Sequence, residues 1–312
     1  MYDVIIDDKI DIVYTWVDGN DENWIKKKNK YSSNRNKIDD TTRFTSIDEL
    51  KYSLRSVYKY ANWVNNIYIV VDDDQKPKWL NLKHPKIHLI KHSQIFPDIN
   101  DLPTFNSQSI ECHLHRIPKL SEYFIYLNDD VFFGNYMYKN DFINKNKMNY
   151  FLNNGGNCVF NLNNIEESKY NSYYSSWNNT QKLLKDNYNL EPSCQWHFGL
   201  ILKKSHFVDM KNKFNKEFKY TSKSRFRGKY KEITPNGLAY RYGLYINDYI
   251  INKNKKGIYI DGKGTDTYLI NSFNNIEIIK PHMFCINNIS KYNPIIIDFL
   301  NNYYPDKSPY EI

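Results

Sequence analysis

Two adjacent acids, Asp129 and Asp130, interrupt an otherwise apolar and aromatic stretch of the chain. The stretch reads IYLNDDVFFG from Ile125 to Gly134. Neighbouring carboxylates repel each other and resist burial unless a positive charge lies between them. A hard divalent cation that completes its shell with phosphate oxygens would provide that charge. We therefore expect this pair to hold a metal ion or to contact a substrate, rather than to form a solvated turn.

The other acidic residues that could serve a functional site can also be explained as ordinary surface residues. Asp72–Asp74 precede the polar segment QKPKW, so we expect a solvated loop there rather than a rival metal site. Glu111 and His115 would share one face of a helix, because they are one turn apart in SQSIECHLHRI. They could act as an acid and a base, and they could equally form a surface salt bridge of small value. The segment lacks the HExxH spacing of a zinc site.

A histidine and a basic segment stand out in the second half of the chain. His197 precedes the apolar run FGLIL, where a lone histidine is more often a hydrogen-bonded core residue than a catalyst. Arg225 and Arg227 lie in TSKSRFRGKYK, which fits either a solvated face or guanidinium forks for phosphate oxygens. The chain contains neither GxGxxG nor GxxxxGK[ST]. A phosphate would therefore be held by metal and arginine.

The elements that must position these residues alternate between strands and helices. β-Type runs lie at residues 11–17, 66–71, 86–92 and 123–127. A helix is predicted over 46–61, where Ser46 and Glu49 form a capping-box pattern, and shorter helices are predicted over 107–117 and 207–218. This alternation predicts a mostly parallel, doubly wound α/β sheet. Ligands of such sheets bind beyond the carboxyl ends of the strands, where the acids at 18, 72–74 and 129–130 fall.

Composition leaves several partners open. The net charge of +8 on 312 residues suits nucleic acid, an anionic membrane surface or a phosphorylated substrate. The four cysteines are far apart and form no CxxC pair, which indicates reduced thiols. The chain shows no signal-peptide pattern and no run of about 18 apolar residues. We expect a cytoplasmic protein, with peripheral attachment to the inner face of the membrane left open.

Long ordered stretches of the chain resemble the Stealth family. Its first two conserved regions are similar to IDIVYTWVDGND, DELKYSLRSVYKYANWVNNIYIVVDDDQKPKWLNL and LPTFNSQSIECHLHRIPKLSEYFIYLNDDVFFG, and its third to HFGLILKKSHFVDMKNKFNKEFKYTSKSRFRGKY. The resemblance is dense over about 10–134 and moderate over 194–230. The family includes bacterial capsule and exopolysaccharide phosphotransferases and the catalytic subunit of the lysosomal-enzyme N-acetylglucosamine-1-phosphotransferase.

The resemblance implies a glycosyltransferase-A-like, Rossmann-type fold and a transfer reaction. A hexose-1-phosphate, which we take to be N-acetylglucosamine-1-phosphate, would pass from a UDP-sugar to a hydroxyl of a glycan or polysaccharide with release of UMP, assisted by Mg²⁺ or Mn²⁺. We expect one catalytic domain over 1–312. Within it, 1–135 would bind the nucleotide sugar, 136–190 would form an Asn/Tyr-rich insertion or lid, and 191–312 would complete the catalytic part.

Family motifs that match this chain also imply its catalytic residues, Glu111, Asp130, His197 and Arg227. With Asp129 beside it, Asp130 would organise the metal or the donor phosphates, and Arg227 would bind phosphoryl oxygens. His197 is the expected general base, because an ordinary pKa near 6.5 suits proton removal at neutral pH. Glu111 would orient that base or bind the acceptor, and Asp130 remains an alternative base.

The resemblance extends to the donor site and has two departures. The residues expected to meet the nucleotide are Thr15, Trp16, Val17, Asp18, Gly19 and Arg43. Arg55 also matches the family pattern and could be structural. Leu200 stands where the family's HMPH has a second histidine, and Asn288 replaces an acid of the fourth region.

Two alternatives to sugar-1-phosphate transfer stay open. A metal-dependent glycosyltransferase would use the same fold and release UDP instead of UMP. A non-catalytic module that binds a polysaccharide or nucleic acid would suit the positive charge and the 28 tyrosines. Acids at three strand ends would repel a polyanion, so we expect no nucleic-acid partner.

Overall fold

The computed structural model describes residues 9–32, 44–151, 172–193, 197–228, 231–252, 256–289 and 292–312. A five-stranded sheet with the order β3-β2-β1-β4-β8 forms its centre. The strands are β1 (Ile10–Thr15), β2 (Ile67–Val71), β3 (Ile87–Lys91), β4 (Tyr123–Asn128) and β8 (Leu200–Lys203). β1, β2, β3 and β4 run parallel, and β8 pairs antiparallel with β4. The sheet confirms the predicted mostly parallel, Rossmann-type α/β fold.

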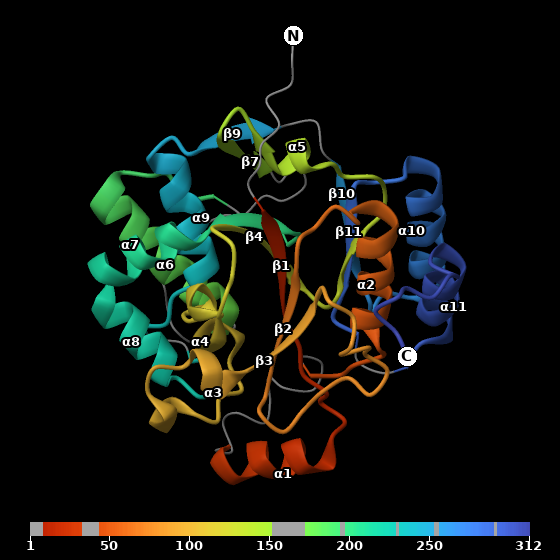
Figure 1. Ribbon diagram of the computed structural model, residues 1–312, viewed down its shortest axis with the longest axis horizontal. Helices are drawn as coiled ribbons and strands as arrows, with labels where there is room; N and C mark the ends of the chain where they lie inside the picture. Colours follow the sequence, from red (N-terminus) through yellow and green to blue (C-terminus); the bar gives the residue numbers. More distant parts are fainter. Residues whose placement is uncertain are drawn as a thin grey trace.

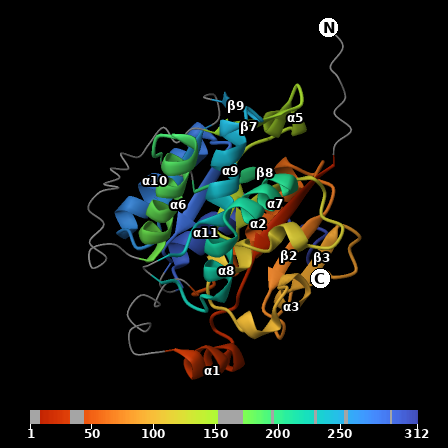
Figure 2. The ribbon, with the colours of Figure 1, turned by 90° about the vertical axis from the view of Figure 1, so that its left-hand side faces the viewer.

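Helices cover both faces of this sheet. In Figure 1, α2 (Glu49–Tyr60), α10 (Asp266–Ile279) and α11 (Pro294–Tyr303) lie to the right of the central strands. On the left lie α6 (Ser172–Tyr188), α7 (Lys204–Lys213), α8 (Asn215–Lys223) and α9 (Pro235–Tyr245). Figure 2 views the molecule from that side, with these four helices in front. Every residue of β2 is buried, as expected for a parallel strand covered on both faces.

The smaller elements complete the described part of the chain. Three helices are short or peripheral: α1 (Glu22–Tyr31), α3 (His92–Ile95) and α5 (Lys139–Phe142). A second sheet has the order β10-β11-β5, built from β10 (Gly257–Asp261), β11 (Met283–Asn287) and β5 (Val131–Phe133). A third has the order β6-β7-β9, built from β6 (Ile143–Asn144), β7 (Lys147–Phe151) and β9 (Tyr249–Asn252). The second sheet matters for the site, because β5 follows directly after Asp130.

The strand order reverses beside β1. The chain proceeds outward from β1 to β2 and β3, and then crosses back to place β4 on the other side of β1. β1 and β4 end together, since Thr15 pairs with Asn128 in the parallel register. The chain leaves β1 toward β2 on one side and leaves β4 on the other side, so the segments that follow Thr15 and Asn128 separate here. Such a switch point creates a crevice at the carboxyl ends of the strands, where α/β folds bind their ligands.

Two predicted helices differ from the observed ones. The helix predicted over 107–117 is wrong in its second half: α4 (Ser107–Glu111) ends early, and a 3₁₀ turn spans Leu114–Arg116. Between them His113 leaves helical geometry with φ −119° and ψ 2°, which lets Leu114 become fully buried. The helix predicted over 207–218 is two helices, α7 and α8, which meet at the non-helical Phe214.

Candidate active site

A cavity of about 640 Å³ opens at the carboxyl ends of β1 and β4. Glu111, Asp130, His197 and Arg227 all line it. They come from α4, from the turn after β4, from the segment before β8 and from the segment after α8. The fold therefore brings to one cavity four groups that are spread over more than a hundred residues of sequence.

The turn after β1 forms one wall of the cavity. Thr15, Trp16 and Val17 line it. The backbone of Asp18 is fixed by the Gln75 amide, which accepts from its N–H at 3.1 Å and donates to its carbonyl at 2.8 Å. These two bonds hold the turn in place, so its backbone is presented to the cavity in one conformation.

Only glycine fits at position 19, because a side chain there would collide with the backbone. A Cβ atom at Gly19 would lie 1.8 Å from the carbonyl oxygen of Phe44, which no side chain can occupy. Phe44 and the indole of Trp24 are packed against each other, with ring centroids 4.9 Å apart, and both line the cavity. Asp18 and Gly19 therefore determine the shape of the turn, and they are not among the residues that line the cavity. The candidate Arg43 lies outside the described residues.

Three carboxyl groups gather at the bottom of the cavity. Asp130 follows β4, and its Oδ1 is buried without a hydrogen-bond partner among the described residues. Asp129 is partly open to the cavity and otherwise enclosed by protein, and this burial, followed by the charges of Glu49 and Asp130, raises its pKa well above the usual range. Burial also raises the pKa of Glu49 to about 7, with Asp130 adding to the rise. No lysine or arginine in the described part of the chain forms an ion pair with any of these three carboxyl groups.

The composition of this group fits a hard divalent cation. No lysine or arginine within the described ranges forms an ion pair with Asp129, Asp130 or Glu49, and the unpaired Oδ1 of Asp130 is available as a ligand. Carboxylate oxygens are the ligands that Mg²⁺ and Mn²⁺ prefer. Glu49 was missed as a site residue because its place in the sequence explained it as a helix-capping acid. It does receive hydrogen bonds from the Ser46 hydroxyl and the Ile47 N–H, at 3.1 and 2.9 Å.

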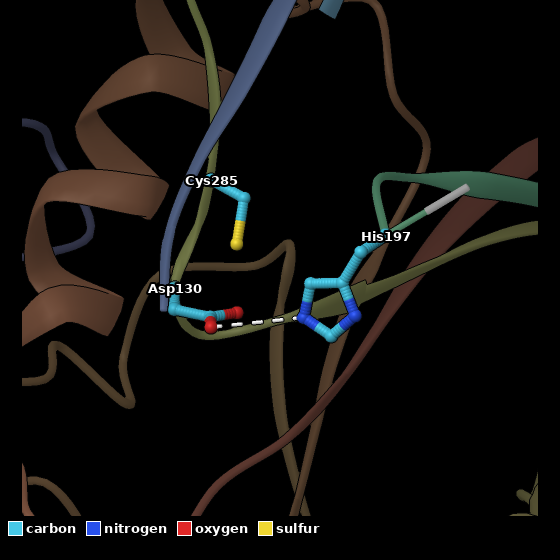
Figure 3. Close-up of side chains that lie close together, drawn as sticks. All are labelled: Asp130, His197 and Cys285. Atoms are coloured by element: carbon cyan, nitrogen blue, oxygen red, sulfur yellow. Dashed lines mark ion pairs between the residues drawn. The ribbon is translucent and has the colours of Figure 1, made fainter. Parts of the chain in front are cut away.

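His197 lies among polar groups beside Asp130. Its Nε2 is 3.8 Å from Asp130 Oδ2, 3.3 Å from Asn287 Nδ2 and 3.5 Å from Asn128 Nδ2. Asn287 also donates to Asp130 Oδ2 at 2.6 Å. Figure 3 shows His197 and Asp130 facing each other, with Cys285 pointing toward the same space. An imidazole so placed can accept a proton and have its positive charge stabilised by the neighbouring carboxylate.

Glu111 and Arg227 also line the cavity and interact with each other through their charges. The Arg227 guanidinium donates to the Ser107 hydroxyl at 2.6 Å and lies 5.7 Å from the ring centroid of Tyr173. Burial raises the pKa of Glu111 to about 7, opposed by the charge of Arg227 and by a long 3.4 Å hydrogen bond from the Tyr126 hydroxyl. A guanidinium that lines the cavity offers a planar set of N–H donors of the kind that binds phosphate oxygens.

The expected pairing of Glu111 with His115 is wrong. α4 ends at Glu111, so the two side chains no longer share a helical face. His115 instead stacks on Phe207, with ring centroids 6.1 Å apart, and burial lowers its pKa to about 4. It is a half-buried residue outside the cavity lining.

The solvated-loop expectation for Asp72–Asp74 is wrong for its first residue. Asp72 is 4% exposed and lines the cavity, whereas the side chain of Asp74 is 75% exposed. The ammonium of Lys27 bridges the two carboxylates at 2.6 Å each. Because a lysine neutralises them, these acids are not left as metal ligands, and Lys27 instead anchors α1 to the end of β2.

Two arginines of the sequence analysis are structural. Arg55 makes a two-pronged ion pair with Glu311, at 2.9 and 2.8 Å, and donates to the Tyr304 carbonyl. Arg225 donates to the backbone carbonyls of Asn100, Leu102 and Pro103. The first ties α2 to the C-terminal segment, and the second holds the loop before α4.

An aromatic rim and the two departures from the family pattern complete the cavity. The lining also includes Tyr173, Tyr174, Trp177, Tyr259, Leu200 and Asn288. Tyr174 and Tyr259 are 50% and 47% exposed. This rim could not be predicted from the sequence, because Tyr173 and Tyr174 belong to an Asn/Tyr-rich stretch with weak periodicity. None of the helices in the described ranges is long and apolar enough to cross a membrane.

Comparison with known proteins identifies the family. Stealth protein CR1, conserved region 1, matches residues 8–35, and Stealth protein CR2, conserved region 2, matches residues 43–151. The capsular polysaccharide phosphotransferase fcs1 of Haemophilus influenzae is 33% identical over 300 residues, which cover 91% of this chain and 79% of fcs1. The chain belongs to the Stealth family. The four cavity residues Glu111, Asp130, His197 and Arg227 therefore sit in a Stealth fold.

Other similarities extend over much of this Stealth chain. The exopolysaccharide phosphotransferase SCO2594 of Streptomyces coelicolor is 32% identical over 315 residues, which are 97% of this chain and 51% of SCO2594. The chain thus spans about half the length of that relative. The apo structure of the bifunctional glycosyltransferase WbbM superimposes with a TM-score of 0.47 and 11% identity, over 98% of this chain and 51% of WbbM. That likeness is too distant to identify a substrate.

Proposed function

We propose that this Stealth protein transfers a hexose-1-phosphate from a UDP-sugar to a hydroxyl of a glycan or polysaccharide and releases UMP. N-acetylglucosamine-1-phosphate is the group we favour. The observation that carries the proposal is the convergence of His197, Asp130, Glu111 and Arg227 on one cavity at the switch point of the sheet. The relatives named as capsular and exopolysaccharide phosphotransferases support the same reaction type.

The reaction needs a base, positive charge and positioning. The acceptor oxygen attacks the phosphorus that bears the sugar, the bond from that phosphorus to the bridging oxygen of UMP breaks, and the bond at the anomeric carbon stays intact. His197 takes the hydroxyl proton, and Asp130 at 3.8 Å stabilises the resulting imidazolium. Arg227 binds the phosphoryl oxygens as charge develops on them.

The buried carboxyl group of Glu111 serves positioning. It lies between the Tyr126 hydroxyl and the Arg227 charge, and its pKa of about 7 keeps it partly protonated at neutral pH. In that state it can donate to an acceptor hydroxyl or accept from one. When a Mg²⁺ or Mn²⁺ ion is bound, Asp129 and Asp130 would hold it and it would neutralise the donor phosphates.

Two groups of aromatic side chains in the cavity lining suit the two substrates. The turn after β1 and the aromatic side chains of Trp24 and Phe44 would hold the nucleoside. The exposed rings of Tyr174 and Tyr259 also line the cavity, and Tyr259 is 6.0 Å from the His197 ring. Aromatic rings beside His197, the proposed general base, are suited to pack against the apolar face of an acceptor sugar.

The released nucleotide tests the proposal. The protein is incubated with Mg²⁺ or Mn²⁺, a panel of UDP-sugars and oligosaccharide acceptors, and the nucleotide products are separated. We expect UMP, and we expect Asp130→Asn and His197→Ala to abolish its release while the proteins remain folded by circular dichroism. UDP in place of UMP would mean that the anomeric bond is broken and that the protein is a glycosyltransferase.

A further inference from the structure

We propose that Asp130, His197 and Cys285 form a Zn²⁺ site that competes with transfer. A carboxylate oxygen, an imidazole nitrogen and a thiol sulfur from these residues all lie within 4.8 Å of one another. In Figure 3 the three side chains point into one space. Mg²⁺ and Mn²⁺ prefer oxygen ligands, whereas a set of sulfur, nitrogen and oxygen is the choice of a borderline cation such as Zn²⁺.

Strand pairing fixes two of the three ligands. Cys285 lies on β11 opposite Val131 of β5, so it neighbours the turn that carries Asp130. The Ile286 N–H donates to the Asp130 carbonyl at 3.1 Å, which locks the two segments together. The Cys285 thiol is fully buried and is within hydrogen-bond reach of the Asp130 carboxyl. The sulfur therefore cannot swing away to the surface.

The separations are close to those of a zinc site. Tetrahedral ligands at 2.0–2.3 Å from Zn²⁺ are roughly 3.3–3.6 Å apart. Asp130 Oδ2 and His197 Nε2 are 3.8 Å apart and all three ligand atoms lie within 4.8 Å of one another, so side-chain rotations that bring these atoms closer would complete the set. Asn287 lies between them, and a half-turn of its amide would present its oxygen as a fourth ligand. Binding of Zn²⁺ releases the thiol proton to solvent.

Occupation by Zn²⁺ would block the reaction of the proposed function, on which this part of the inference rests. The cation takes the Nε2 lone pair with which His197 accepts the acceptor proton. It also takes the carboxylate of Asp130 from the Mg²⁺ or Mn²⁺ position. Zn²⁺ should therefore inhibit transfer in the presence of Mg²⁺, and Cys285 should set the affinity of that inhibition.

A spectroscopic test does not require turnover. The 312-residue chain is titrated with Co²⁺, whose bond to a thiolate produces a near-ultraviolet charge-transfer band, and Zn²⁺ is then added to displace the Co²⁺. We expect the band in the wild-type protein and its loss in Cys285→Ser, which keeps a hydroxyl donor for Asp130. Cys112→Ser is the matched control, because that thiol is equally buried but lies in another core cluster. Cys158→Ser and Cys194→Ser cover the two remaining thiols.

The outcomes are separable from those of the proposed function. Absence of the band in the wild type, or its survival in both Cys285→Ser and Cys285→Ala, would overturn the zinc site whatever the protein transfers. If transfer is observed, the Zn²⁺ concentration that halves each protein's own rate should rise about tenfold or more in Cys285→Ser and stay unchanged in Cys112→Ser. An equal sensitivity of the two variants would contradict the proposal.

Discussion

Replacing Glu111 by glutamine should make the protein more stable at alkaline pH and less active. Burial raises the pKa of this carboxyl from 4.5 to about 7 in the folded chain. The folded state therefore binds the proton more tightly than the unfolded state between these two values. Stability that is fully present below pH 4.5 is lost as the pH rises through about 7, because the charged form must then be buried. At about 1.4 kcal/mol per pH unit, the loss is about 3 kcal/mol.

Glutamine has nearly the same shape and no charge to bury, so the variant escapes this loss. The assay is urea unfolding of wild-type and Glu111→Gln proteins at intervals between pH 4 and pH 9. Subtracting the two curves cancels the titrating groups that do not interact with residue 111. The difference should be smallest near pH 4, rise through pH 7 by about 3 kcal/mol in favour of the variant, and then level off. If the difference in unfolding free energy between the two proteins does not vary with pH, the pKa of the Glu111 carboxyl is not raised by burial.

The other predictions concern separate parts of the cavity and its frame. Gln75→Ala removes both hydrogen bonds to the Asp18 backbone, so the KM for the donor should rise several-fold in steady-state kinetics while kcat changes less. Tyr259→Ala should raise the KM for the acceptor and leave that for the donor unchanged; an equal effect on both would place the ring elsewhere. Arg55→Ala should cost about 3–5 kcal/mol in urea unfolding by leaving Glu311 buried and unpaired, and Arg55→Met combined with Glu311→Leu should recover most of it. If the Arg55→Met/Glu311→Leu protein is no more stable than Arg55→Ala, an unpaired Glu311 is not the cause of the lost stability.

The sequence predicted the parts of the fold that depend on local pattern. β1, β2, β3 and β4 were placed within one or two residues, because buried parallel strands are runs of apolar residues that end in polar ones. α2 was found through its apolar face. The capping box expected from Ser46 and Glu49 is not formed, because the helix begins at Glu49 with Asp48 as its N-cap residue. The early end of α4 was missed, since the burial of Leu114 in the following turn depends on neighbours that are distant in the sequence.

The candidate site was predicted where a single segment carries the chemistry. Asp129 and Asp130 stood out because charges are rare inside an aromatic run. Cys285 and Asn287 did not stand out, because only the pairing of β11 with β5 brings them to Asp130. The aromatic rim and the burial of Asp72 likewise depend on contacts between segments far apart in the chain.

The fate of the donor's β-phosphorus tests the central claim most directly. A UDP-sugar labelled with ³²P at the β position is incubated with the protein, a divalent cation and an oligosaccharide acceptor, and the products are separated. Transfer of a sugar-1-phosphate predicts that the label moves to the acceptor, that the released nucleotide is unlabelled UMP, and that Asp130→Asn abolishes the movement. Label that stays on the nucleotide as UDP while the acceptor gains an unlabelled sugar would contradict the account.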